Sequence, residues 1–273
     1  MPARRLVTVM LLTALLAGAG YYFGTLCDGM QRAHLLLLPF SRDVLVLLLW
    51  LLLSLGLLTV AAGAVASLFR PLPLAFAAFL LCGAAMLLGW GIDVHSALLT
   101  LVLVLVGMLY ACWVQAELRK RVEFSAGVVA EPQRLLLLAL LVVALVSFYL
   151  GYREYLEVRG FAIPEVYLSR LEDQISERVA LVIPEILRAS MRGVIREQLQ
   201  GVLSEQVNLA IRPMTRYMPG AVTLLLGVLL LTVTYLFSWL PVVVLWLLLF
   251  GLRLSGLVRT TTETLEVKRL AIV

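Results

Sequence analysis

Asp93 and His95 carry the side chains in this sequence best suited to exchanging a proton or holding a metal ion. An Asp-x-His pair at the start of a helix could act as a general base or supply half of a metal site. The alternative is a structural pair, in which the aspartate caps the helix and the histidine lies at the membrane surface. Since no second pair of metal ligands accompanies them, we favour the capping role and expect neither a metal nor a cofactor.

The sequence patterns of common catalytic and redox sites are missing. HExxH, GxSxG and the P-loop pattern do not occur. The three cysteines, Cys27, Cys82 and Cys112, are widely spaced and form no CxxC pair. The sequence therefore predicts a non-enzymatic protein with no catalytic residues.

Arg253 is a charged residue at the end of a long apolar stretch. A charge inside a bilayer is costly and often functional, so Arg253 could attract an anion in a pore or a broken helix. At a helix end its long side chain can instead reach the headgroups, and we favour that role. Thr223, Thr234 and Ser238 in the same stretch could line a water path between associated helices, or bond back to the preceding helical turn.

The composition indicates which solvent surrounds these residues. Of the 273 residues, 62% are hydrophobic and 14% are charged, and the mean hydropathy is +1.02. A soluble domain is roughly 45–50% apolar and about 25% charged. Several runs exceed the roughly 18 apolar residues that mark a membrane-spanning helix. We therefore expect an all-α, polytopic protein of the cell membrane, most simply the bacterial inner membrane, with the lipid bilayer as its main partner. The sequence contains no block of basic residues dense enough to favour nucleic acid as a partner.

Residues 1–151 are predicted to form a bundle of five membrane-spanning helices. The first apolar run could be a signal peptide, but we favour a retained span because its apolar part is long for such a peptide. Small residues in "GAGYYFG" (18–24), "AAGAVAS" (61–67) and "CGAAMLLG" (82–89) favour close helix packing. The five apolar runs are 6–24, 44–69, 74–91, 97–114 and 135–150, the last possibly continuing as a helix through "GYREYLEVRG".

Residues 152–219 differ from the rest, because they contain nine arginines, nine acidic residues and no lysine. Apolar residues recur there at intervals of three and four, which predicts amphipathic helices over about 164–182 and 184–211. This charge-balanced section is expected to be a helical cap. Its apolar stripe could pack within the chain or across a homo-oligomer, on lipid, or on a separate partner, and we favour the first. The residues predicted to make an oligomer or partner contact are Leu187, Met191, Ile195, Leu199 and Val202.

Residues 220–258 are predicted to form one or two further membrane helices, kinked near Pro241. The apolar part is too long for one crossing of a hydrocarbon layer about 30 Å thick. A hairpin of two short spans and one span followed by a kinked interfacial helix both fit, which gives seven or six spans. Residues 259–273 form a polar tail, with an alternation that also suits a short strand.

The distribution of basic residues favours six crossings with both chain ends in the cytoplasm, or the inverted arrangement with seven. We favour six, because Arg119–Arg121 is the densest basic cluster in a short loop.

The stretch "RPMTRYMP" and the tail "RTTTETLEVKRL" resemble uncharacterised multi-span bacterial membrane proteins, including those of candidate phyla. The resemblance covers about the last 80 residues. It implies a membrane location and assigns no role to any residue. Taken together, the sequence predicts an oligomeric, pore-like or transport-related subunit. The alternative is a scaffold or assembly protein that recruits a membrane protein partner through its 152–219 helices.

Overall fold

The computed structural model describes residues 3–32, 42–120, 127–159 and 217–254, and within these ranges every regular element is a helix. The predicted all-α class is confirmed. Helices are expected in lipid because each backbone N–H and C=O must find its partner within the segment itself. The helices are α1 (Ala3–Arg32), α2 (Arg42–Leu68), α3 (Leu72–Trp90), α4 (Val94–Lys120), α5 (Gly127–Arg159), α8 (Met218–Leu236) and α9 (Trp239–Leu254).

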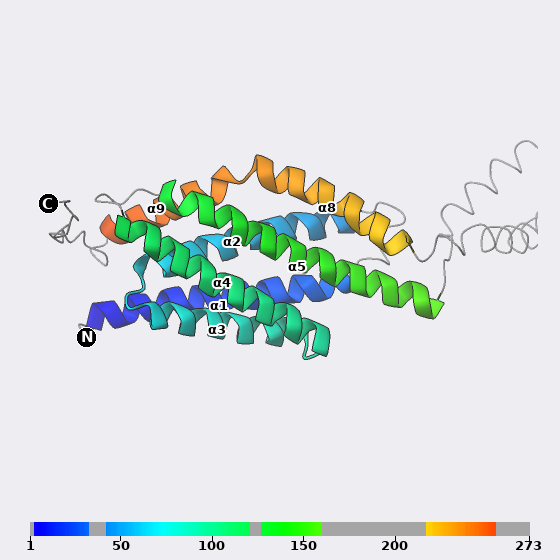
Figure 1. Cartoon of the computed structure of the whole chain (residues 1–273), viewed down its shortest axis with the longest axis horizontal. Helices are drawn as coiled ribbons and strands as arrows, with labels where there is room; N and C mark the ends of the chain where they lie inside the picture. The colour runs from blue at the N-terminus through cyan, green and yellow to red at the C-terminus, as the bar shows by residue number, and fades with distance from the viewer. Residues whose placement is uncertain (1–2, 33–41, 121–126, 160–216, 255–273) are drawn as a thin grey trace, which may run out of the picture.

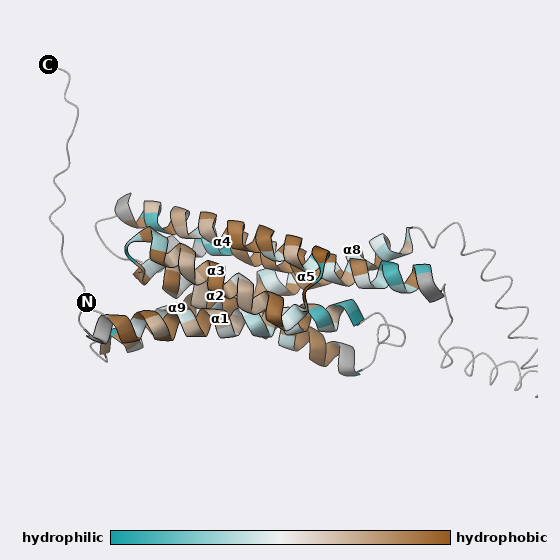
Figure 2. Ribbon diagram, turned by 90° about the horizontal axis from the view of Figure 1, so that it is seen from below, coloured by the Kyte–Doolittle hydropathy of each residue, from teal (hydrophilic) through white to brown (hydrophobic). Residues whose placement is uncertain are grey.

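The helices lie side by side, and successive ones run in opposite directions except for α8 and α9, which share one direction (Figure 1). We call the end where α1 begins and α9 ends the proximal end; α2 and α4 also end there, and α3 and α5 begin there. The other end, where α5 ends and α8 begins, is the distal end, and it holds the α3–α4 turn. Hydrophilic residues gather towards the two ends and hydrophobic residues fill the length between them (Figure 2).

Six of the described helices, α1 to α5 and α8, are long and apolar enough to cross a membrane. The multi-pass membrane architecture is thereby confirmed. The helices extend beyond the apolar runs, because charged residues at the headgroup level can continue a helix. The clearest case is α5, which runs unbroken from Gly127 to Arg159 and so includes "GYREYLEVR".

The bundle core is built on a close contact between α1 and α3. Gly20 and Gly24 are four residues apart on α1, and a Cβ added at Gly20 would lie 2.6 Å from Cys82 Sγ. Gly24 faces the backbone carbonyl of Met86, and Gly89 of α3 faces the carbonyl of Tyr21. Glycines with this spacing let two helix backbones approach closely. The "GAGYYFG" segment is therefore a packing motif.

The chain from Met218 to Leu254 keeps one direction along the bundle and does not fold back at Pro241 (Figure 1). α8 packs on α5, where Gly227 lies against Leu145. Further along, α9 packs on α2, where Leu245 lies against Gly63. α8 and α9 thus make one crossing in two pieces, and both chain ends of the described bundle lie at the proximal end.

Three backbone N–H groups at the break between α8 and α9 keep a carbonyl partner. The N–H of Phe237 donates to the Val233 carbonyl at 3.1 Å, and the N–H of Ser238 donates to the Tyr235 carbonyl at 3.2 Å. Because Pro241 has no N–H, it cannot donate to the Phe237 carbonyl, which accepts from Leu240 at 3.0 Å instead. These tighter turns reduce the number of backbone groups that the bend exposes to lipid.

Candidate functional site

Asp93 and His95 lie together in the exposed α3–α4 turn at the distal end. His95 Nδ1 is 3.2 Å from Asp93 Oδ2, and both side chains are more than half exposed. Hydrogen bonds from the backbone N–H of Val94, then from the His95 side chain, hold the pKa of Asp93 below its ordinary value. The Asp93 N–H donates to Ser96 Oγ at 3.0 Å. The Asp93 carboxylate thus accepts from the backbone of the first turn, while the Asp93 N–H donates to a side chain of that turn, as in a helix cap. The first role of the Asp93–His95 pair is therefore to start α4.

The structure provides no metal centre around this pair. Within the described ranges, no three His, Cys, Asp or Glu side chains come together as a metal site would require. Cys27 and Cys82 are buried in the bundle and Cys112 is partly buried, all with free thiols.

Arg253 lies in the last turn of α9, where its side chain is exposed. A cation there interacts favourably with the negative end of the helix dipole. Its position at the proximal end also lets the side chain extend to the headgroups. The structure thus places Arg253 at the surface of the bundle and away from the Asp93–His95 pair.

The hydroxyl groups of α8 divide into two kinds. Thr232 Oγ1 donates to the Val228 carbonyl at 2.8 Å, one turn back along its own helix. Thr223 Oγ1 and Thr234 Oγ1 are buried and make no hydrogen bond. Thr234 lies in the last turn before the break, and Ser238 is partly buried at the break itself. The exposed Tyr235 adds a third hydroxyl group within about one turn of chain.

Buried amides and hydroxyls tie the helices together, and sequence reasoning missed them. Ser147 Oγ of α5 donates to the Cys27 carbonyl of α1 at 2.7 Å. Gln115 Nε2 of α4 donates to the Phe69 carbonyl, just past the end of α2, at 2.8 Å. Gln133 of α5 is 1% exposed, and neither atom of its amide has a partner. The sequence signal that could have identified these residues is a polar side chain inside or beside an apolar run.

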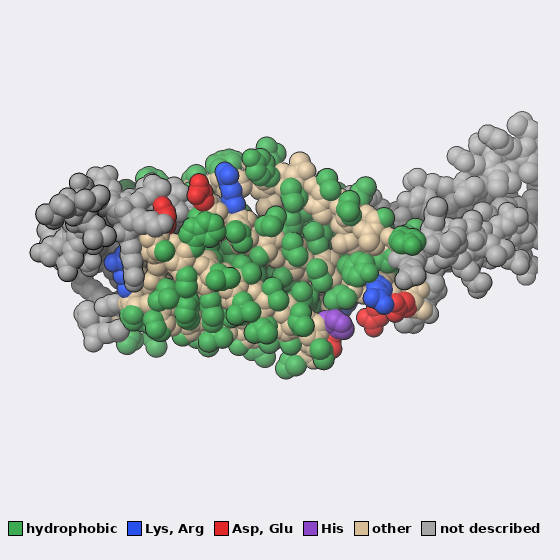
Figure 3. Space-filling view, viewed as in Figure 1, with side chains coloured by type: hydrophobic (Ala, Val, Ile, Leu, Met, Phe, Trp, Pro, Cys, Tyr) green, Lys and Arg blue, Asp and Glu red, His purple; other side chains and the backbone are tan. Residues whose placement is uncertain are grey.

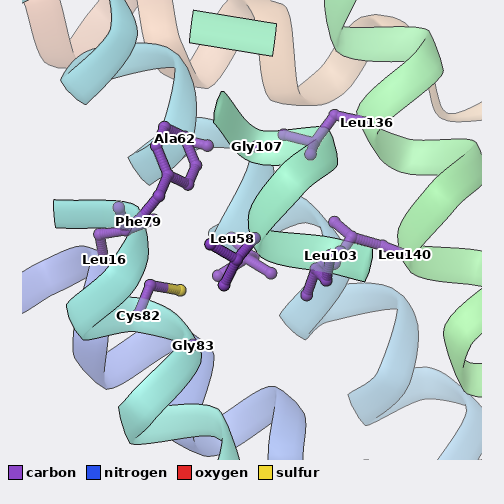
Figure 4. A pocket seen from close by; sticks show the side chains of 11 residues that line it. Leu16, Leu58, Ala62, Phe79, Cys82, Gly83, Leu103, Gly107, Leu136 and Leu140 are labelled. Atoms are coloured by element: carbon purple, nitrogen blue, oxygen red, sulfur yellow. The ribbon is translucent and has the colours of Figure 1, made fainter. Parts of the chain in front are cut away.

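A small cavity lies at the centre of the bundle, among α1 to α5 (Figure 4). Its volume is about 20 Å³, which leaves room for a sphere the size of one water molecule. A buried water needs two or more polar partners, and the lining is apolar. The cavity is therefore dry, and it is no path for a polar solute through one chain. Its lining residues are Leu16, Leu58, Ala62, Phe79, Cys82, Gly83, Leu103, Val104, Gly107, Leu136 and Leu140.

The predicted contact residues of the cap, Leu187 to Val202, and the tail 259–273 lie outside the described residues.

The outer surface of the bundle is the last feature that defines the class of protein. Hydrophobic side chains cover most of the described face in Figure 3, and the few charged side chains lie in small groups, one of them well in from the left-hand end. Such a surface suits hydrocarbon and not water. With six helices able to span, the chain is an all-α, multi-pass membrane protein.

Comparisons of this chain with protein-family models, with curated proteins and with solved structures found no match.

Proposed function

We propose that this chain is a non-enzymatic, self-associating subunit of a membrane pore or transport assembly, and that its α8–α9 crossing lines the path between copies. The observation that carries the proposal is the break at Phe237–Ser238 within this crossing. Interrupted membrane helices are typical of the sites where transporters hold and pass a solute.

The chemistry at the break supports this role. Tyr235, which is 70% exposed, and the partly buried Ser238 place hydroxyl groups on the outer side of the break. A hydroxyl can donate to and accept from water or a passing solute. In hydrocarbon alone such a group would gain nothing over a methyl.

The position of the crossing explains why the path would form between copies. α8 and α9 contact the bundle through α5 and α2, and they cover one side of it (Figure 1). Their other side is exposed, including Tyr235, Phe237 and Trp239 around the break. The centre of the bundle, by contrast, is packed with apolar side chains. A polar solute would therefore move along the outside of α8–α9, where a second copy can enclose it.

The first experiment measures mass in lipid nanodiscs and solute flux in liposomes. A closed ring of copies that passes small ions or neutral solutes is expected. Tyr235→Phe should lower the flux severalfold without changing the mass. Tyr21→Phe is the matched control, because Tyr21 is also exposed but lies on α1.

Other outcomes decide between this function and the alternative. The proposal would be contradicted by a monomer whose liposomes pass none of the tested solutes. If that monomer also co-purifies with one defined membrane protein, the scaffold function is favoured, with recruitment through residues 152–219. Equal flux through Tyr235→Phe and the wild type would contradict the role of the break.

A further inference from the structure

The two ends of the bundle differ in charge. Among the described residues, the proximal end carries seven basic and two acidic residues, and the distal end carries four basic and five acidic residues. The basic residues of the proximal end are Arg4, Arg5, Arg70, Arg119, Lys120, Arg134 and Arg253. Because α8 and α9 run in one direction, Arg253 joins this end of the bundle, whereas the other six basic residues share it through the alternating directions of α1 to α5.

The basic residues at the two ends also differ in their partners. At the distal end, Arg32 pairs with Asp28 at 2.8 Å and Arg153 pairs with Glu157 at 2.8 Å. At the proximal end, Arg134 and Arg253 are exposed, and neither forms an ion pair within the part of the chain that the structure describes. Two of the distal guanidinium groups are thus neutralised by the protein, whereas these two proximal groups are not.

Arg134 and Arg253 belong to neighbouring helices. α5 and α9 contact each other, and Arg253 lies in the last turn of α9. Arg134 lies two turns into α5, beside the apolar run that begins at Leu135. An arginine at that depth extends along the helix so that its guanidinium reaches the headgroup layer. Guanidinium groups bind phosphate oxygens in a bidentate manner.

We infer that the proximal end faces the cytoplasm, and that Arg134 and Arg253 bind the phosphate of anionic phospholipids in the cytoplasmic leaflet. Basic residues near membrane helices are retained on the cytoplasmic side, and anionic lipids give that leaflet a negative potential. The distal end, with the Asp93–His95 pair and the junctions of α5 and α8 with residues 160–216, then faces the other side. This inference depends on the membrane class and not on the proposed transport function.

The sidedness is tested in intact cells of a bacterial host. Ile92 is 86% exposed in the distal turn, so Ile92→Cys should react with a maleimide that cannot cross the membrane. The wild-type chain is the control, because its three cysteines lie within the helices. A green fluorescent protein fused to the carboxyl terminus of the full chain should fluoresce, and alkaline phosphatase fused there should be inactive. Protection of Ile92→Cys together with an active phosphatase would overturn the inference.

The headgroup contact is tested by native mass spectrometry of the purified protein, titrated with phosphatidylglycerol, phosphatidylcholine or inorganic phosphate. Binding of phosphatidylglycerol in preference to the other two is expected. Arg134→Gln and Arg253→Gln should each weaken it by about fivefold, the usual contribution of a basic residue at an anionic membrane surface. Arg32→Gln and Arg153→Gln are matched controls and should leave it unchanged. The proposed contact would be overturned if the proximal and distal variants lost the same affinity for phosphatidylglycerol, or if phosphatidylcholine bound as well as phosphatidylglycerol.

Discussion

Gly24 of α1 lies directly against the backbone carbonyl of Met86 of α3. Nothing larger than a hydrogen atom fits at that point, so the distance between these two helices is set by a glycine. Gly20, one turn earlier, has the same relation to Cys82. The pair explains why a chain rich in leucine places small residues in its first helix, since helices in lipid gain their stability from close packing.

A larger side chain at Gly24 should force α1 and α3 apart. We expect Gly24→Leu to lower the free energy of unfolding by about 1–3 kcal/mol or more, the usual cost of overpacking. The measurement is thermal unfolding in detergent, followed by a dye that reacts with Cys27 and Cys82 as they become exposed. Gly18→Leu is the control, because a Cβ at Gly18 meets nothing within 4 Å. Equal destabilisation by both substitutions would contradict the packing role.

Ser147 should contribute a hydrogen bond between helices. Removing its hydroxyl in Ser147→Ala leaves the Cys27 carbonyl without the 2.7 Å contact from α5. We expect a loss of about 0.6 kcal/mol, and at most about 1.7 kcal/mol, as measured for such bonds in other membrane proteins. Ser54→Ala is the control, because Ser54 Oγ bonds only to Leu51 of its own helix. The two variants are compared by unfolding in a denaturing detergent, and a larger loss from Ser54→Ala would argue against the assignment.

Asp93 should stabilise the start of α4 in a pH-dependent manner. Its pKa is lowered in the folded protein by hydrogen bonds from Val94 and His95. A lowered carboxyl pKa adds stability that is fully present above the ordinary value of 3.8 and is lost as the pH falls through the folded value. Asp93→Ala should therefore lower the melting temperature at neutral pH, and this difference should shrink when both proteins are acidified below pH 3.8.

His95 provides the comparison for that experiment. His95→Ala removes one hydrogen bond to Asp93 and leaves the bond from the Val94 backbone, so it should have the smaller effect. A melting-temperature difference for Asp93→Ala that is the same at all pH values would contradict the cap.

Pro241 should maintain the bend between α8 and α9. Pro241→Ala restores a backbone N–H that can donate to the Phe237 carbonyl. The bend between α8 and α9 should therefore become smaller, so that the two helices approach one straight helix. Spin labels at Leu229 and Leu247, both about half exposed, should then lie further apart. Val243→Ala, a control on the same helix, should leave the separation unchanged. Unchanged separation in Pro241→Ala would show that packing on α5 and α2, and not the proline, fixes the bend.

Much of the fold could be predicted because lipid permits few solutions. A run such as Val44–Phe69 has to become a helix when its backbone has no water to bond, and α2 covers nearly the same residues. The small residues of "GAGYYFG" similarly favoured close helix packing, but they did not identify α3 as the partner. The capping role of Asp93 was also accessible, since it depends on residues within one turn of each other.

The features that sequence reasoning missed all depend on residues far apart in the chain. Ser147 and Cys27 meet across 120 positions, and Gln115 reaches Phe69 across 46. Each polar residue was visible in the sequence, but its partner is a backbone carbonyl, which every residue has. No pattern of side chains can identify such a partner.

The sequence by itself determined the solvent of this protein and the position of its first five long helices, because apolar run length sets the free energy of entering lipid. It also determined where a bend could occur, since Pro241 removes an N–H wherever it is placed. The tertiary structure decided whether that bend becomes a hairpin or a continuous crossing. That outcome depends on whether α9 packs back on α8 or onward against α2, and the contact of Leu245 with Gly63 shows the second. The end of the bundle at which Arg253 lies follows from that contact.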